Sequence, residues 1–308
     1  MAEMPTVSVV IVNYETSAMV RRCVASLRQQ DPVPEIIVVD NPSAANDAAN
    51  LDDLGVKVVR NPENIGYGLA CNSGAAAGTG RFVCILNPDT ELPGGTLAAW
   101  VEVFQQVPDA GLIAPRLLND NGTPQRSAYH FIGPLTYWVY HSIFAGLMKR
   151  FRKSVALGSD SSGAIQRADW VMGAAMLIPR DVWEQIGGFS DQYFLYSEDT
   201  DLCWRIHEAG YEVYLAPWVS IIHTQGEPSV QNRDTSIGRY YDGFQTFLKL
   251  RYPPWRRHLV EISIILDMLI RIPIFSVAAI LRPKAVIHRR RLRGYVAAMG
   301  QFVRSLFS

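Results

Sequence analysis

Cysteine is scarce in this chain, and the few cysteines present are scattered. Only four occur in 308 residues, Cys23, Cys71, Cys84 and Cys203, and no two of them form a Cys-x-x-Cys pair. This spacing excludes a disulfide framework and a zinc site built from paired cysteines. We therefore interpret the cysteines as small apolar residues of a protein that works in a reducing compartment.

The sequence also lacks an internal repeat, a low-complexity tract and a signal peptide. Residues 1–6 have no basic segment and lead directly into an apolar run, so we expect the main part of the chain in the cytoplasm. Hydrophobic residues make up 48% of the chain and charged residues 19%, which predicts a globular protein and excludes a disordered one. The length permits one large domain, or one domain with an appendage.

The formal net charge is zero, but the charges are divided unevenly along the chain. Residues 249–308 contain twelve Lys and Arg against only Glu261 and Asp267, a net charge of +10, and the remainder carries −10. This asymmetry predicts that the end of the chain meets an anionic partner. Nothing in the sequence matches a nucleic-acid-binding motif, so nucleic acid is not the expected partner.

The first half of the chain alternates short apolar runs with segments of helical spacing. The apolar runs are residues 7–12, 36–39, 56–59 and 82–86, and the helical segments are residues 17–30, 68–77 and 96–106. This alternation predicts an α/β fold with a doubly wound sheet that binds its ligand at the carboxyl ends of the strands.

The second half is less regular, and its composition changes near Arg251–Trp255. Before that point we expect one strand over residues 169–178, helices over 181–186 and 199–209, and two short strands over 212–215 and 219–222. After it the chain turns basic and apolar. We therefore predict a domain over residues 1–250 and an amphipathic helical region over residues 251–308.

Polar residues follow the first two predicted strands. Tyr14 and Glu15 come just after the first, and Asp40 ends the second. A carboxylate at this edge can accept a hydrogen bond from a pyrimidine base or a ribose hydroxyl, although Asp40-Asn-Pro is also ordinary turn chemistry. Asn64-Ile-Gly-Tyr-Gly68 opens a helix whose N-terminus favours anions, with a plain capped turn as the alternative.

Asn87-Pro88-Asp89 follows a fully apolar predicted strand, which places Asp89 at the same edge. A carboxylate there can hold Mg²⁺ or Mn²⁺, and the ion can bridge a diphosphate; a simple strand-end turn is the alternative. His223 ends another short strand. An imidazole at that position completes a metal site with Asp89 if the fold brings the two together, and is otherwise structural.

Glu198, Asp199 and Asp201 form the densest acidic cluster, at the start of a predicted helix. The helix dipole stabilises ionised carboxylates in a first turn, which keeps one available as a general base; helix capping is the alternative. Asp201 lies on a different helical face from Asp199, so we expect Asp201 to brace the structure.

Taken together, these segments resemble the family 2 glycosyltransferases of GT-A fold, and among them the bacterial rhamnosyltransferases. The resemblance implies an α/β fold with a Rossmann-like, doubly wound mixed sheet. The resemblance covers residues 4–226 and depends on the order and spacing of several motifs. These are VSVVIVNYE from Val7, IIVVDN from Ile36, NIGYGLACNSG from Asn64, ILNPDTEL from Ile85, GAAMLIPR from Gly173 and GGFSDQYFLYSEDTDLCWRIHEAGYEVYLAP from Gly187.

The resemblance implies an inverting, metal-dependent hexosyltransferase with Asp199 as the base, beside Glu198. It implies that a nucleotide-sugar donor is bound by Asn13, Tyr14, Glu15, Asp40, Asn41, Asn64, Gly66, Asn72, Asn87 and Asp89. It further implies that Asp89 and His223 hold Mg²⁺ or Mn²⁺. The chain departs from the Asp-x-Asp pattern of the family at Asn87, whose amide can bind through oxygen but adds no charge.

For substrates, the resemblance favours L-rhamnose from dTDP-L-rhamnose, or a UDP-sugar donor, and a lipid-linked or cell-envelope glycan acceptor. One branch of these enzymes uses polyprenyl-diphospho-N-acetylglucosamine, which implies a role in cell-wall polysaccharide synthesis. Two alternatives stay open at this point: a sugar nucleotidyltransferase, which has a related nucleotide-binding architecture, and a non-catalytic, membrane-associated glycan-binding scaffold.

Residues 259–281 are long and apolar enough to span a bilayer, but Glu261, Asp267, Arg271 and Pro273 interrupt them. We therefore predict helices that lie in the interface, on the cytoplasmic face of the membrane, with Lys284 and the arginines at 289–293 against anionic lipid. Residues 295–307 supply a second amphipathic stretch. Residues 131–152, which end in a basic run at 149–153, are a further candidate contact, with a helical packing face or an oligomer interface as the alternative.

Overall fold

A computed structural model of the chain describes residues 6–43, 51–140, 142–147, 163–224, 233–281 and 286–306. The chain forms two compact units. The first consists of residues 1–129, 157–194 and 198–226, and the second of residues 130–156, 195–197 and 227–308.

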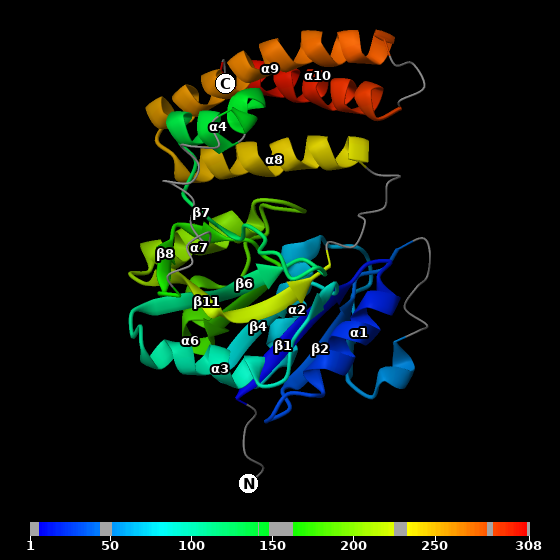
Figure 1. Ribbon diagram of the computed structural model, residues 1–308, viewed down its shortest axis with the longest axis vertical. Coiled ribbons are helices and arrows are strands. Elements are labelled where there is room, and N and C mark those ends of the chain that lie inside the picture. Colours follow the sequence, from blue (N-terminus) through cyan, green and yellow to red (C-terminus); the bar gives the residue numbers. More distant parts are fainter. Residues whose placement is uncertain are drawn as a thin grey trace. The chain divides into compact units, whose positions relative to one another are not determined.

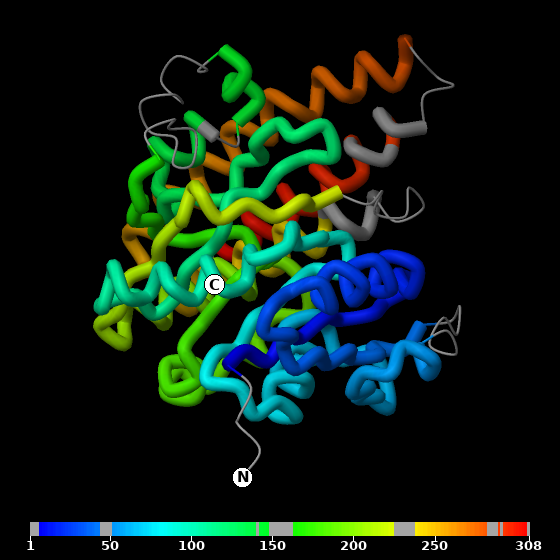
Figure 2. Tube along the Cα trace, turned by 60° about the horizontal axis from the view of Figure 1, so that its bottom comes forward, coloured from blue at the N-terminus to red at the C-terminus, as the bar shows by residue number. Residues whose placement is uncertain are grey.

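A mixed sheet forms the centre of the first unit, and strands from both halves of the chain alternate in it (Figures 1 and 2). Its order is β3-β2-β1-β4-β10-β6-β11-β5, with β8 on β11. The strands are β1 Val7–Asn13, β2 Glu35–Asp40, β3 Lys57–Arg60, β4 Phe82–Leu86, β5 Thr90–Glu91, β6 Ala110–Leu118, β8 Gln166–Ala168, β10 Ala175–Pro179 and β11 Glu212–His223. β1 to β4 run parallel, whereas β10 is antiparallel to both of its neighbours. The predicted mixed α/β sheet is confirmed.

Helices cover both faces of this sheet. They are α1 Ser17–Leu27, α2 Tyr67–Ala77, α3 Thr96–Glu102, α6 Arg180–Ile186 and α7 Glu198–Glu208. Side chains of α1 and α3 join one buried cluster, and side chains of α2, α6 and α7 join another. Short 3₁₀ helices at Asp52–Leu54 and Val103–Gln105 complete the unit.

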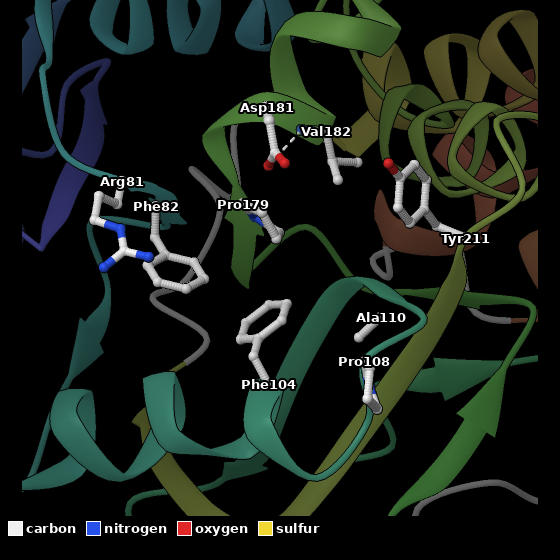
Figure 3. Close-up of a pocket in the computed structure, with 9 residues that line it drawn as sticks. All are labelled: Arg81, Phe82, Phe104, Pro108, Ala110, Pro179, Asp181, Val182 and Tyr211. Carbon is white, nitrogen blue, oxygen red and sulfur yellow. Dashed lines mark hydrogen bonds between the residues drawn. The ribbon is translucent and has the colours of Figure 1, made fainter.

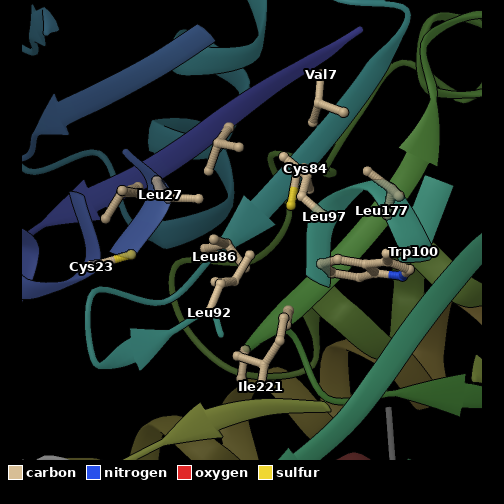
Figure 4. Close-up of a cluster of buried hydrophobic side chains, with 14 of the residues drawn as sticks. Val7, Cys23, Leu27, Cys84, Leu86, Leu92, Leu97, Trp100, Leu177 and Ile221 are labelled. Carbon is tan, nitrogen blue, oxygen red and sulfur yellow. The ribbon is translucent and has the colours of Figure 1, made fainter. Parts of the chain in front are cut away.

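The two clusters follow from the alternation of side chains along the strands. In β1, Val9 and Ile11 belong to the cluster under α1 and α3, whereas Val10 and Val12 belong to the cluster under α2. Figure 4 shows the first cluster, where Trp100 lies among aliphatic side chains and donates its indole N–H to the Ile113 carbonyl at 3.0 Å. All four cysteines are buried and free, as the sequence predicted.

The structure corrects two strand predictions. The expected strand over 169–178 is two strands in different sheets: β9 (Trp170–Val171) pairs with β7 (Ala128–Tyr129), and β10 begins only at Ala175. Between them the Gly173 N–H donates to a side chain, so it cannot join a strand ladder. Conversely, the two strands expected over 212–222 form one strand, β11, with a register shift around Pro217, which lacks the N–H of a regular pairing.

The second unit is helical. It contains α4 (Pro134–Tyr140), a 3₁₀ turn at Ile143–Gly146, α8 (Arg233–Arg251), α9 (Pro254–Leu281) and α10 (Val286–Leu306). Figure 1 shows α9 and α10 side by side.

This helical unit begins before residue 251, where the composition of the chain changes. Helix α8 belongs to it because Tyr241 packs edge-on against Phe302 and the Gln301 amide donates to Asp242. The basic run at 149–153, Lys284 and Phe307, which the sequence offered as membrane contacts, lie outside the described residues.

A hollow of about 450 Å³ lies where β4 and β6 begin. Figure 3 shows its lining, with Phe82 and Phe104 on one side and Asp181 and Tyr211 on the other. It opens at the amino ends of these parallel strands, whereas α/β sheets bind ligands at the carboxyl ends. The hollow is therefore not part of the candidate site.

Candidate functional site

Asn13 and Asp40 end β1 and β2 and lie opposite each other in the register of the two strands. The Asn13 amide donates to Asp40 Oδ1 at 3.1 Å, and both side chains are buried. Just beyond them Tyr14 and Glu15 are exposed. This end of the sheet therefore presents a buried carboxylate beneath exposed side chains.

Asn41 connects this rim to the loop before α2. Its amide donates to Asn64 Oδ1 at 2.7 Å, and its carbonyl oxygen accepts from the Ile65 N–H at 3.2 Å. Gly66 follows with φ +87°, and a Cβ at Gly66 would lie 2.5 Å from the Phe194 carbonyl oxygen, so only glycine fits there. The structure thus brings Asn13, Asp40, Asn41, Asn64 and Gly66 together.

Asn72 does not join this group. Its amide donates to the Phe189 carbonyl at 2.8 Å, and its carbonyl oxygen accepts from the Phe189 N–H at 2.9 Å. Both polar ends of the side chain thus hold the loop before residue 190 against α2. Asn72 therefore braces the fold through these two bonds, and its contact with a nucleotide sugar stays a prediction.

Asp89 and His223 meet, although they lie far apart in the sequence. β5 and β11 pair antiparallel with His223 opposite Thr90, and the Thr224 N–H donates to the Asp89 carbonyl at 3.0 Å. The Asp89 Oδ1 atom lies 3.4 Å from His223 Nε2, and the two side chains are only 14% and 7% exposed. The fold therefore holds a carboxylate and an imidazole as a close pair.

Gln125 orients the ring of His223. The Gln125 amide nitrogen donates to the His223 carbonyl and, at 2.9 Å, to Asn119 Oδ1, which identifies Oε1 as its acceptor atom. Oε1 lies 2.8 Å from His223 Nδ1, so Nδ1 carries a proton. In a neutral imidazole the lone pair is then on Nε2, which faces Asp89.

This pair fits a divalent cation. Two adjacent ligands of an octahedral ion with bonds of about 2.1 Å lie about 3 Å apart, close to the 3.4 Å between the Asp89 and His223 atoms. A lone pair and a carboxylate repel each other unless a cation or proton lies between them. Within the described residues no three His, Cys, Asp or Glu side chains converge, so diphosphate or water oxygens would supply the other ligands.

Asp199 lies at the same edge of the sheet. One carboxylate oxygen accepts from the Gly173 N–H at 3.0 Å, and the other accepts from the Thr200 N–H at 2.7 Å. Gly173 precedes β10, whose first residue, Ala175, pairs with Leu86 at the carboxyl end of β4. Asp199 as a whole residue is half-buried.

Tyr67 joins the Asp199 segment to Asn87. Its hydroxyl donates to Asn87 Oδ1 at 2.9 Å and lies 3.3 Å from the Gly173 carbonyl, and burial raises the pKa of Tyr67 well above its usual value. A neutral hydroxyl is thus held between the two segments. Because the Asn87 amide oxygen already accepts this bond, the position that departs from Asp-x-Asp has a protein partner.

Glu198 and Asp201 differ from Asp199 in their surroundings. Asp201 is fully buried, accepts from the Tyr193 hydroxyl and pairs with Arg205 at 2.8 Å, which confirms its bracing role. Glu198 is also buried. Burial, followed by the charge of Asp199, raises the pKa of Glu198 to about 8. Burial raises the pKa of Asp199 as well, and the two carboxyls interact.

The raised pKa of Glu198 predicts a stability that falls as pH rises. Between its ordinary value of 4.5 and about 8, the unfolded chain has released the proton while the folded chain keeps it. The free energy of unfolding should therefore decrease over this range, and less steeply in Glu198→Gln. Urea unfolding at several pH values measures this slope. The exposed Glu63→Gln change is the control and should keep the wild-type slope; equal slopes in all three proteins would contradict the prediction.

Sequence reasoning did not identify Gln125, Tyr67 and Gly173 as site residues. Gln125 lies in a polar turn after β6, where nothing local distinguishes it from other turn residues. Tyr67 and Gly173 lie within motifs that were used for the family resemblance, but their contacts cross 106 residues of sequence. Only the fold connects them.

The mixed α/β sheet with helices on both faces is the fold of the GT-A glycosyltransferases. The chain belongs to the family described as Glycosyl transferase family 2, whose model matches residues 8–171. A second model, described as the N-terminal domain of galactosyltransferase, matches residues 153–227. This membership decides against the nucleotidyltransferase and the non-catalytic scaffold.

Relatives of known name share most of the chain. The chain is 25% identical over 264 residues to an N-acetylglucosaminyl-diphospho-decaprenol L-rhamnosyltransferase of Mycobacterium tuberculosis, covering 81% of this chain and 86% of that protein. It is 26% identical to the low-salt glycan biosynthesis hexosyltransferase Agl10 of Haloferax volcanii, covering 77% and 73%.

Solved structures share the fold. The mannosyltransferase PcManGT from Pyrobaculum calidifontis, in complex with GDP-Man and Mn²⁺, has a TM-score of 0.56 at 16% identity and covers 98% of this chain and 88% of that one. GalNAc-T7 with UDP, GalNAc and Mn²⁺ also has a TM-score of 0.56, at 19% identity. That match covers 79% of this chain and 48% of the larger protein.

Proposed function

We propose that this glycosyltransferase transfers L-rhamnose from dTDP-L-rhamnose, with inversion, to a hydroxyl of a lipid-linked N-acetylglucosamine, and that it uses Mg²⁺ or Mn²⁺. The observation that carries the proposal is the convergence at one rim of Asp89 with His223, 3.4 Å apart, and of Asp199 on Gly173. The first pair suits a diphosphate-bound cation, and the Asp199 carboxylate suits a general base.

In the proposed step, the acceptor oxygen attacks the anomeric carbon of the donor sugar as the bond from that carbon to the diphosphate breaks. Asp199 takes the proton of the acceptor hydroxyl, and the nucleoside diphosphate leaves. Burial raises the pKa of Glu198, so this carboxyl resists carrying a second negative charge beside Asp199. A bound divalent cation supplies positive charge that stabilises the leaving diphosphate.

The remaining rim residues suit the nucleoside. Asp40 can accept from a base imide or a ribose hydroxyl, with Asn13, Asn41 and Asn64 holding the rim in place by their mutual bonds. Tyr14 and Glu15 are exposed just beyond it and can close over a bound nucleoside. Asn87 accepts the hydrogen bond of the Tyr67 hydroxyl, and this bond holds Tyr67 between the nucleoside-binding residues and the segment that contains Asp199.

The comparisons support the substrate assignment. The Mycobacterium tuberculosis relative is named for L-rhamnosyl transfer to a decaprenol-linked N-acetylglucosamine and covers most of both chains. Both structural neighbours contain Mn²⁺ and a nucleotide or nucleotide sugar. We extend these properties to this chain as proposals, because the rim contains groups of the required kind.

Turnover with a panel of donors tests the proposal. Purified protein is given dTDP-L-rhamnose or UDP-sugars, with a short-chain polyprenyl-diphospho-N-acetylglucosamine as acceptor and with Mn²⁺, Mg²⁺ or EDTA. We expect rhamnosylated acceptor and free dTDP, and no product in EDTA. If only a UDP-sugar is turned over, with release of UDP, the donor is that UDP-sugar and not dTDP-L-rhamnose. Full turnover in EDTA would remove the metal from the proposal.

Gln125 is expected to affect the site without touching substrate. Gln125→Leu removes the acceptor that keeps the proton on His223 Nδ1, so Nε2 loses its defined lone pair. Loss of such an outer partner typically costs 10- to 100-fold in metal affinity. Titration of Mn²⁺ in the presence of dTDP, followed by electron paramagnetic resonance, measures this. The exposed Gln192→Leu change should keep wild-type affinity; equal affinity in both variants would show that Gln125 has no such role.

A further inference from the structure

Helix α9 has an unusual distribution of side chains, because its exposed face is entirely apolar. From Trp255 to Ile280 the large exposed side chains recur every three to five residues, which places them along one side of the helix, and Leu281 adjoins the last of them. They are Trp255, Leu259, Ile262, Leu266, Leu269, Ile274, Val277, Ile280 and Leu281, between 44% and 75% exposed. We call this set the apolar stripe.

The two acidic side chains of α9, by contrast, are fully buried. Asp267 is fully buried and accepts from the Tyr137 hydroxyl at 3.0 Å, from the Ile143 N–H at 2.8 Å and from Arg271 at 2.5 Å. Glu261 is fully buried and accepts from the Ser305 hydroxyl at 2.9 Å.

These bonds fix the rotation of α9 within the helical unit. Asp267 ties it to the segment that contains α4, and Glu261 ties it to α10. A helix rotated to put these carboxylates in water would leave Tyr137 and Ser305 without their acceptor and would bury the stripe instead. The exposure of the stripe is therefore a consequence of specific polar contacts.

The part of the chain that contains the stripe is basic. Glu261 and Asp267 are the only acidic residues after residue 248, and both are buried, so this part of the chain presents no carboxylate side chain to its surroundings. Its twelve basic residues include exposed Lys249, Arg289, Arg293 and Arg304. Such a surface attracts an anionic partner and repels a second copy of itself.

Helix α9 is long and apolar enough to cross a membrane by length and composition. Its buried face, however, packs on α10, which begins with a run of arginines and would not enter hydrocarbon. A helix with one continuous apolar face and a polar network behind it suits a position in the plane of the interface. At about 1.5 Å per residue its 28 residues extend about 42 Å along such a surface.

We propose that the apolar stripe docks into the interface of a bilayer rich in anionic lipids, with α9 in the membrane plane. The proposal deepens the proposed function. It rests on that function only in explaining why the enzyme binds a membrane, because a lipid-linked acceptor is found there. The docking itself follows from exposure and charge, and it is tested without any turnover.

The test is flotation of the full chain with vesicles of phosphatidylglycerol and phosphatidylcholine, compared with phosphatidylcholine alone. We expect binding to the anionic vesicles that weakens as salt rises, and a loss of about tenfold or more in the Leu266→Glu, Leu269→Glu double variant. Because both side chains are exposed, the variant should fold. Leu250→Glu, 46% exposed on α8 and outside the stripe, is the matched control and should bind like wild type.

Two further measurements separate the possible outcomes. In one outcome the wild type does not float, while sedimentation shows a dimer that the double variant does not form. In that case the stripe is a protein interface and the proposal is overturned. A wild type that is monomeric and does not float also overturns the proposal. Transfer to a water-soluble acceptor by the double variant should equal that of wild type. If flotation behaves as expected but wild type shows no transfer, the proposed function fails while the docking surface stands.

Discussion

Asp199→Asn is expected to reduce sugar transfer by 10²- to 10⁴-fold while nucleotide binding persists. The amide keeps the size of the side chain but has a single acceptor oxygen, so it can accept from only one of the Gly173 and Thr200 N–H groups, and it cannot take a proton from an acceptor hydroxyl. Steady-state release of nucleoside diphosphate measures the first effect. The midpoint shift on adding dTDP and Mn²⁺ in a thermal unfolding assay measures the second.

The matched control for this change is Asp191→Asn, the same substitution at an exposed carboxylate outside the rim. It should keep wild-type turnover. Asp201→Asn serves a different purpose, because it weakens the buried contacts to Tyr193 and Arg205 and should lower the unfolding midpoint. Full turnover by Asp199→Asn would end the assignment of this residue as the base.

Asp89→Asn is expected to lower turnover by at least 10²-fold, and its defect should originate in donor binding. The substitution removes the one negative charge of the Asp89–His223 pair, and with it most of the attraction for a divalent cation. The thermal shift caused by dTDP with Mn²⁺ should shrink towards the shift caused by dTDP with EDTA.

His223→Ala should resemble Asp89→Asn, and the double variant should be little worse than either, because the two side chains act on one ion. Asp120→Asn, at an exposed turn, is the control for the carboxylate change and should behave as wild type. If both Asp89→Asn and His223→Ala bind nucleotide with the same Mn²⁺ dependence as wild type, these two residues do not hold the metal.

Much of the first unit could be predicted because its signals are local. The run from Val7 to Val12 is short, β-branched and apolar, a composition that favours a buried strand. Asp40 and Asp89 end or follow strands of this kind, so their position at the binding edge follows from the direction of the parallel strands. The helix beginning at Glu198 was marked by its acidic first turn.

Predictions were weaker wherever a residue serves two segments. Asn72 lies in a motif that resembles a nucleotide-binding turn, yet its amide pairs with Phe189, 117 residues away. The strand expected over 169–178 breaks because Gly173 donates to Asp199. In each case a distant partner competes for a backbone or amide group, and no local pattern reports the result.

The sequence by itself determined the alternating α/β order, the carboxylates that follow strands, and the basic, apolar end of the chain. These depend on side-chain periodicity and charge, which are properties of neighbours in the chain. Only the tertiary structure decided that Asp89 meets His223 under the control of Gln125, and that Glu261 and Asp267 turn inward so that α9 exposes its apolar side. The reason is that hydrogen bonds between distant segments set the rotation of each element, and burial then selects which of its faces remains outside.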